Sequence, residues 1–238
     1  MFSVSSFFTL TTSCCGGGAG GGGGGKSSGD IPSSSMFALS SRFGLMSLTK
    51  RSLAELDTGY AKKIYFDPQQ NGIWESLPDQ ILPELSNIDV IIKFGMGLLA
   101  ETEKIPTRYG VLSYHHGDPS FYRGRPAGFW ESLNSEKIIG VIVQQLSKTL
   151  DGGIVRSIGF SKVSQTSYKR TMKDMYATGI PLLRIALKNC KDGVDIAYQK
   201  SDVVLKLPSN RLLFKLLLKQ FLRVIQRAKY GAFIQKSW

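Results

Sequence analysis

The two histidines of the chain stand side by side, at His115 and His116, and the residues after them are the most promising for chemistry. Histidine exchanges protons near neutral pH more readily than any other side chain. A histidine pair alone more often belongs to the core or the surface than to a site. Here a loop of glycine, proline and arginine follows, with Gly117, Pro119, Arg123, Gly124, Arg125, Pro126 and Gly128. Loops defined so strongly by their backbone residues usually carry function.

Buried strands are expected to position this loop. An almost continuous apolar run over Asp89–Phe94 is typical of a strand covered on both faces of a parallel sheet. Three further strands are predicted, at Tyr109–Tyr114, Ile138–Leu146 and Gly153–Phe160. The histidines would then directly follow the second strand. In open α/β sheets ligands lie beyond the carboxyl ends of strands, so the loops after Phe94, Tyr114 and Leu146 are the places to look.

Helices are predicted around these strands. One covers Phe129–Leu133, and another covers Tyr168–Lys188, where Pro181 should kink or divide it. Weaker patterns predict a helix over residues 36–61, a strand at Lys63–Phe66 and a helix over Ile73–Leu85. Strands alternating with helices indicate an α/β fold.

The stretch from Asp89 to about Asn189 resembles the catalytic half of the folate-dependent formyltransferases, a family that includes methionyl-tRNA, glycinamide-ribonucleotide and sugar-nucleotide formyltransferases. In that family a strand ends in Asn-x-His, an Arg-Gly pair follows in a loop, and an aspartate comes later in a Leu-Asp-x-Gly turn. Here His115 takes the histidine position, and Arg123-Gly124 follow in the loop. Asp151 takes the position of the aspartate, 36 residues after His115.

The resemblance implies a Rossmann-like, mostly parallel sheet of the formyltransferase type and transfer of a formyl group from 10-formyltetrahydrofolate to an amine. Such a transfer passes through a tetrahedral intermediate that carries an oxyanion, so it needs a hydrogen-bond donor and a proton relay. By resemblance, His115 is the donor, Asp151 orients it and relays the proton, and Ser113 supports them.

The resemblance also implies a folate-binding wall and an acceptor. The expected folate-binding residues are Phe94, Gly95, Met96, Gly97, Leu98, Arg123, Gly124 and Leu146. The expected acceptor is a small-molecule amine, either an amino sugar or a phosphorylated metabolite, and tRNA is less favoured. No metal is expected, because the three cysteines make neither a disulfide framework nor a zinc-binding spacing.

The sequence departs from the family in two places. Ser113 stands where the family has the asparagine that helps to bind the formyl oxygen. Residues 36–89 show no clear βαβ opening, which in the family holds the acceptor. The alternative is therefore a non-catalytic, formyltransferase-like remnant that acts as a basic membrane-surface or interaction protein.

Three segments are expected along the chain: residues 1–35, 36–200 and 201–238. The first is rich in glycine and serine and should be disordered. Gly25-Lys26-Ser27 imitates the end of a phosphate-binding loop but lacks the flanking strand and helix. A transit peptide stays open, so a cytoplasmic or organellar-matrix location is expected, and no apolar run is long enough to span a membrane.

The net charge of +12 (30 basic and 18 acidic residues) favours anionic partners. Part of this charge belongs to a predicted basic amphipathic helix over residues 211–229. Its cations repeat every fourth residue, at Arg211, Lys215, Lys219, Arg223 and Arg227. Such a helix can pack on the domain with a solvated cationic face, lie on a membrane surface, or bind a nucleic-acid or protein groove.

Overall fold

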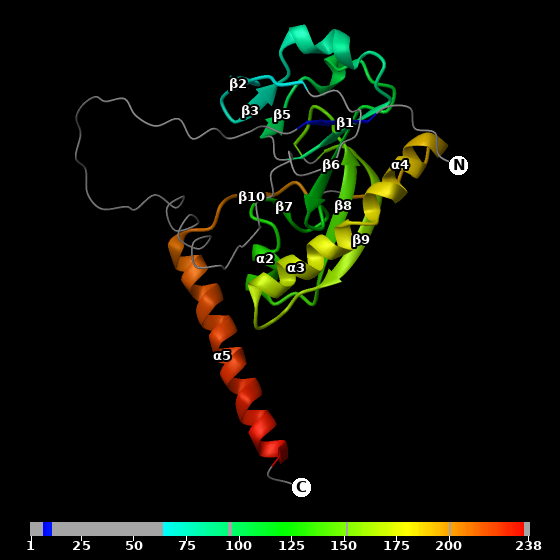
Figure 1. Cartoon of the computed structure of the whole chain (residues 1–238). Coiled ribbons are helices and arrows are strands. Elements are labelled where there is room, and N and C mark those ends of the chain that lie inside the picture. Colours follow the sequence, from blue (N-terminus) through cyan, green and yellow to red (C-terminus); the bar gives the residue numbers. More distant parts are fainter. Residues whose placement is uncertain (1–6, 11–63, 95–96, 151, 200, 236–238) are drawn as a thin grey trace, which may run out of the picture.

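The computed structural model describes residues 7–10, 64–94, 97–150, 152–199 and 201–235, and a five-stranded sheet forms its centre (Figure 1). In spatial order the strands are β1 (Phe7–Leu10), β4 (Val90–Lys93), β6 (Val111–His116), β8 (Ile138–Gln145) and β9 (Ile154–Lys162). Strands β1, β4 and β6 are parallel, whereas β8 runs antiparallel to both β6 and β9.

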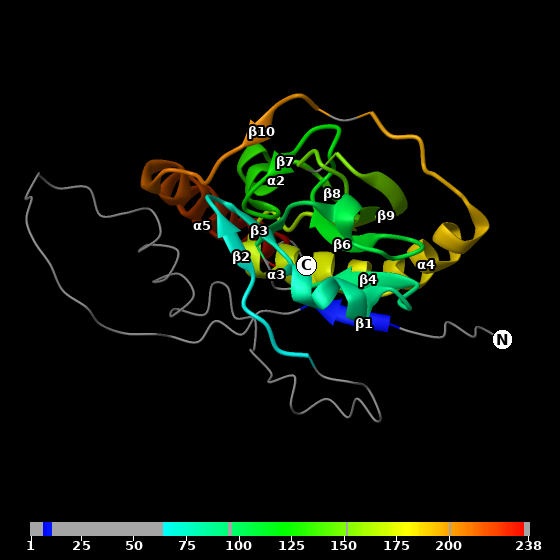
Figure 2. The ribbon, with the colours of Figure 1, turned by 90° about the horizontal axis from the view of Figure 1, so that it is seen from above.

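Two small sheets lie beside the central one. Strands β2 (Gln69–Asn71), β3 (Trp74–Ser76) and β5 (Leu98–Leu99) form the first, and β7 (Arg123–Gly124) pairs with β10 (Val204–Leu205) in the second. Figure 2 shows β10 alongside β7, and β1 at the sheet edge beside β4. Four of the seven strand pairings within the described residues are parallel, which confirms the predicted mostly parallel α/β class.

Four α-helices and two 3₁₀ helices occur in the described ranges. They are η2 (Asp79–Leu85), η3 (Thr102–Lys104), α2 (Phe129–Asn134), α3 (Tyr168–Gly179), α4 (Leu182–Asp192) and α5 (Asn210–Gln235). Ser167 caps α3 by accepting a hydrogen bond from the backbone N–H of Arg170. Pro181 stands at the N-cap of α4 and divides α3 from α4, as predicted. None of these helices combines the length and apolar character needed to cross a membrane.

The sheet has a hydrophobic core on each face, which explains its apolar runs. Side chains alternate between faces along a strand, so Val90 and Leu112 enter one core while Ile91 and Val111 enter the other. The first core includes residues of α2, α3 and α4, and the second includes Leu85 of η2. Strands β4 and β6 are therefore covered on both sides.

Several predictions about the elements are wrong. Phe7–Leu10 form β1 although they were placed in a disordered leader. Residues 64–66 form no strand, and only the second half of Ile73–Leu85 is helical. His115 and His116 end β6 rather than follow it, because pairing with β8 continues as far as His116. The glycine-rich run and the predicted helix over residues 36–61 lie outside the described residues.

Helix α3 should contribute strongly to stability through Met175, which is completely buried against the sheet. We expect Met175→Ala to lower the free energy of unfolding by about 2–5 kcal/mol, because it removes buried contacts and leaves a cavity. Lys173→Ala, on the exposed face of the same helix, should change it by less than about 0.5 kcal/mol. Urea unfolding at neutral pH measures both variants, and equal effects would contradict this packing.

Candidate functional site

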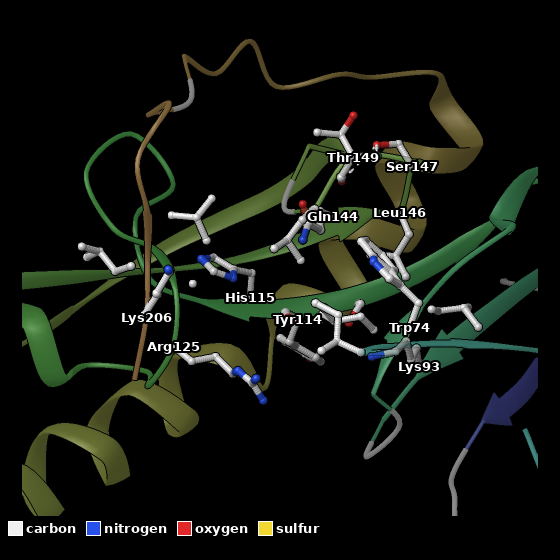
Figure 3. A pocket seen from close by; sticks show the side chains of 18 of the residues that line it. Trp74, Lys93, Tyr114, His115, Arg125, Gln144, Leu146, Ser147, Thr149 and Lys206 are labelled. Carbon is white, nitrogen blue, oxygen red and sulfur yellow. Dashed lines mark hydrogen bonds between the residues drawn. The ribbon is translucent and has the colours of Figure 1, made fainter. Parts of the chain in front are cut away.

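An open cavity of about 580 Å³ lies along the last part of β6 (Figure 3). Ser113 and His115 line it, and both side chains are buried. They are two residues apart on one strand, so they belong to the same face of the sheet. Leu98, Gly124 and Leu146 line the same cavity. The fold thus brings five of the residues expected from the sequence around one space.

Three other residues expected at the site do not line the cavity: Phe94, Gly97 and Arg123. Phe94 does not line the cavity, and its ring packs against Tyr114 with 5.8 Å between the ring centroids. The backbone N–H of Gly97 donates a hydrogen bond to the Glu75 carboxylate at 2.8 Å. Asp151, Gly95 and Met96 lie outside the described residues.

Arg123 supports the cavity without lining it. Its guanidinium donates one hydrogen bond to the backbone carbonyl of Ser201 at 2.6 Å and another to that of Leu150 at 2.5 Å. Leu150 itself lines the cavity. The arginine therefore joins the segment after β8, which supplies Leu150 to the cavity wall, to the segment that leads into β10, whose own residues Val204 and Leu205 line the cavity.

The two histidines have different environments. His115 lines the cavity, and its Nε2 atom is 3.4 Å from the carbonyl oxygen of Tyr122. A carbonyl oxygen can only accept a hydrogen bond, so this contact favours a proton on Nε2. His116 instead packs between Tyr114 and Tyr176, with centroid distances of 5.9 and 4.8 Å. It is an aromatic core residue and not part of the cavity wall.

Gln144 is a cavity residue that the sequence analysis missed. It is only 2% exposed, and its Oε1 atom has no hydrogen-bond partner among the described residues. It lies directly opposite Ser113 in the pairing of β6 with β8. The signal available in the sequence was the change from apolar residues to glutamine at the end of β8, which marks a polar position within a buried strand. An unfilled buried acceptor is costly unless a ligand or water fills it, so Gln144 is a candidate contact.

Cations surround the cavity. Figure 3 shows Trp74 and Lys93 on one side and Arg125 and Lys206 on the other. No aspartate or glutamate belongs to the cavity wall within the described part of the chain. The cavity therefore favours an anionic ligand, and Trp74 offers a flat apolar surface to a ring.

A buried carboxyl group lies close to His115 but outside the cavity wall. Glu131 of α2 is 2% exposed, and this burial raises the pKa of its carboxyl group to about 7. A hydrogen bond to its own backbone, and then the nearby His115, oppose the rise in pKa, whereas Glu136 and Asp118 add to it. The charge of Glu131 therefore changes near neutral pH.

No protein-family model matches the sequence, and no curated protein matches it. The structure is similar to HypX from Aquifex aeolicus in complex with tetrahydrofolic acid, at 22% identity and a TM-score of 0.46, over 55% of this chain and 23% of that one. It is also similar to an N-formyltransferase from Helicobacter canadensis in complex with folinic acid and dTDP-3-aminofucose. The identity is 13% and the TM-score 0.47, over 61% of this chain and 59% of that one. A third similar structure is phosphoribosylglycinamide formyltransferase from Campylobacter jejuni, at 21% identity and a TM-score of 0.39, over 46% of this chain and 58% of that one. The match spans less than two thirds of each of these proteins.

The partly buried imidazole of His116 should make stability depend on pH. Burial, and then the neighbouring His115, lower the pKa of His116 to about 4. An unfolded histidine titrates near pH 6.5, so below that pH the unfolded state binds a proton that the folded state resists. The free energy of unfolding should therefore fall between about pH 6.5 and 4.

His116→Phe should remove this contribution. We expect the fall in unfolding free energy from pH 7 to 4 to be about 2–3 kcal/mol smaller in the variant than in the wild type. The carboxyl groups are the same in both proteins, so the difference isolates the histidine. Urea unfolding at several pH values measures it, and parallel pH dependences in the two proteins would contradict the assignment.

Proposed function

We propose that this protein transfers a formyl group from 10-formyltetrahydrofolate to an amine. One observation carries the proposal: Ser113 and His115, from the family-like signature, line one cavity together with Leu150, the residue before Asp151. The expected residues Leu98 and Leu146, and Gly124 of the Arg-Gly loop, line the same cavity. A cavity of about 580 Å³ has the size of a small-molecule site.

The proposed reaction begins when the amine attacks the formyl carbon. A bond from nitrogen to carbon forms, and the formyl oxygen becomes an oxyanion. His115 donates a hydrogen bond to this oxygen, and the Ser113 hydroxyl donates a second one. The bond between the formyl carbon and the folate nitrogen then breaks, and the amine proton passes to the leaving nitrogen. In this proposal Asp151 orients His115 and relays that proton.

The cavity wall supports a folate-type donor. Trp74, Leu98 and Leu146 provide apolar contacts for a flat heterocycle, and Gln144 offers a buried amide that can pair with its ring N–H groups. Four further residues stay in the proposal as expected folate-binding residues: Phe94, Gly95, Met96 and Gly97. Arg123 acts in it by holding the wall in place rather than by touching the donor.

The cationic rim supports an acceptor that carries negative charge. Lys93, Arg125 and Lys206 line the cavity, and no acidic side chain joins them in the described part of the wall. A phosphorylated amine, such as an amino sugar linked to phosphate, fits this charge. A whole tRNA is not favoured, because the cavity itself matches a small molecule.

Calorimetry with 5-formyltetrahydrofolate, a stable analogue of the donor, tests the folate half of the proposal. We expect the wild type to bind with a dissociation constant on the order of micromolar, and His115→Ala to bind up to about tenfold more weakly. With an accepted amine, His115→Ala should also lower the transfer rate by about 10²–10³, because it removes the oxyanion donor.

His116→Phe is the matched control, because it changes the neighbouring histidine that does not line the cavity. It should bind the analogue as the wild type does. If the folded wild-type protein binds no analogue, the catalytic proposal fails.

We also propose that α5 attaches the protein to an anionic membrane surface. Leu216 of α5 is buried against the domain, but Phe214, Leu218 and Phe221 on another face are 64%, 45% and 61% exposed. Their spacing forms a single apolar stripe. Figure 1 shows the carboxyl half of α5 extending away from the domain. The helix contains no aspartate or glutamate. Lys219 and Arg223 hydrogen-bond to the domain, whereas the other three regularly spaced cations are exposed and complement a negative surface: Arg211, Lys215 and Arg227.

Sedimentation with lipid vesicles tests this attachment. We expect binding to vesicles that contain phosphatidylserine, weakened by salt, and little binding to neutral vesicles. Phe214→Ser with Phe221→Ser should weaken binding at least about tenfold, because each exposed ring loses its burial in lipid. Ile180→Ser, at an exposed apolar residue outside α5, is the control and should have no effect. Equal binding to both kinds of vesicle, or none, would contradict the proposal.

A further inference from the structure

Glu131 is a buried carboxyl group with one unfilled acceptor atom. It lies on α2 with 2% of its surface exposed, and its Oε1 atom has no hydrogen-bond partner among the described residues. Burying a carboxyl group without filling its acceptors destabilises a protein. A neutral apolar side chain would fit such a place at less cost. The position of Glu131 next to the site therefore needs a physical reason.

Gly117 shows how close Glu131 is to His115. A side-chain carbon at Gly117 would lie 3.2 Å from Nε2 of His115 and 3.7 Å from Oε1 of Glu131. The same carbon would lie 2.9 Å from the carbonyl oxygen of Tyr122. The imidazole nitrogen, the carboxyl oxygen and this carbonyl therefore surround one small space, which the missing side chain of Gly117 keeps open.

The protonation state of His115 determines how many hydrogen bonds its ring can donate. Nε2 is 3.4 Å from the carbonyl oxygen of Tyr122, which can only accept a hydrogen bond, so this contact favours a proton on Nε2. If the ring is neutral and protonated on Nε2, Nδ1 can only accept a hydrogen bond. Nδ1 can donate one only when the ring is an imidazolium. A negative charge close to Nε2 favours that form.

We propose that Glu131 is a positioning residue that acts on the site through His115, by stabilising the imidazolium form of that ring with its negative charge. Its consequence for catalysis rests on the proposed formyl transfer, in which His115 donates to the oxyanion. The other titratable groups near Glu131 are Asp118, Tyr122, Glu136 and Tyr168, and His116 adjoins His115. Of these, the Glu136 carboxyl is exposed and gives a matched control.

Proton NMR of the imidazole rings tests the proposal without any substrate. The chain has two histidines, so two sets of ring signals are expected, and His116→Phe assigns them. We expect Glu131→Gln to lower the pKa of His115 by at least about half a unit, because it removes the adjacent negative charge. Glu136→Gln removes an exposed carboxylate and should shift the pKa of His115 much less.

A second measurement covers the case in which Glu131→Gln does not fold. Carbon-13 NMR of the wild-type carboxyl groups follows the ionisation of Glu131 directly. The His115 ring signals should show an inflection at the same pH as Glu131. If Glu131 ionises and the ring signals do not respond, or if folded Glu131→Gln leaves the His115 titration unchanged, the proposal is overturned.

The catalytic consequence is measured separately. In Glu131→Gln, the pH profile of kcat should lose the inflection that Glu131 contributes near neutrality. If Glu131 only supported the structure, the substitution would lower kcat by the same factor at every pH. Coupled titration in a protein that transfers no formyl group would reject the proposed function and leave the role of Glu131 intact. Formyl transfer in a protein whose His115 titration does not respond to Glu131 would support the proposed function and reject the role of Glu131.

Discussion

Five residue pairs hold β6 against β8, from Leu112 opposite Gln145 to His116 opposite Val141, and this pairing determines the geometry of the site. It places Ser113 opposite Gln144, so that two polar side chains meet within an apolar sheet. A slip by one residue would turn Ser113 and His115 to the opposite face of the sheet. The cores on the two faces prevent this slip, because Val111 and Leu112 fill opposite cores and could not exchange places.

The same layer combines good packing with unsatisfied polar groups. Gln144 and Glu131 each have a buried side-chain oxygen without a hydrogen-bond partner in the described residues, and both lie next to β6. Each lowers stability by an amount that the surrounding core must offset. Proteins accept such local costs mainly where the polar groups meet a ligand or regulate a neighbour. This concentration of costly groups around β6 distinguishes the site from the rest of the sheet.

Much of the central fold could be predicted from local patterns. The apolar runs gave β4, β8 and β9, and Pro181 gave the division between α3 and α4. The antiparallel direction of β8 could not be predicted, because a strand buried on both faces has the same apolar pattern in either direction. His115 and Ser113 were recognisable from the resemblance of their segment to the formyltransferase signature. Glu131 and Lys206 were not, because their relation to the cavity depends on contacts between distant parts of the chain.

The pairing of β7 with β10 has a consequence for the order in which the protein becomes complete. Val204 pairs with Arg123, and the segment after β10 supplies Lys206 and Leu207 to the cavity wall. A growing chain leaves the ribosome from its amino end, so these residues emerge after all strands of the central sheet. A nascent chain that stops before β10 can assemble the sheet and still lack one wall of the cavity.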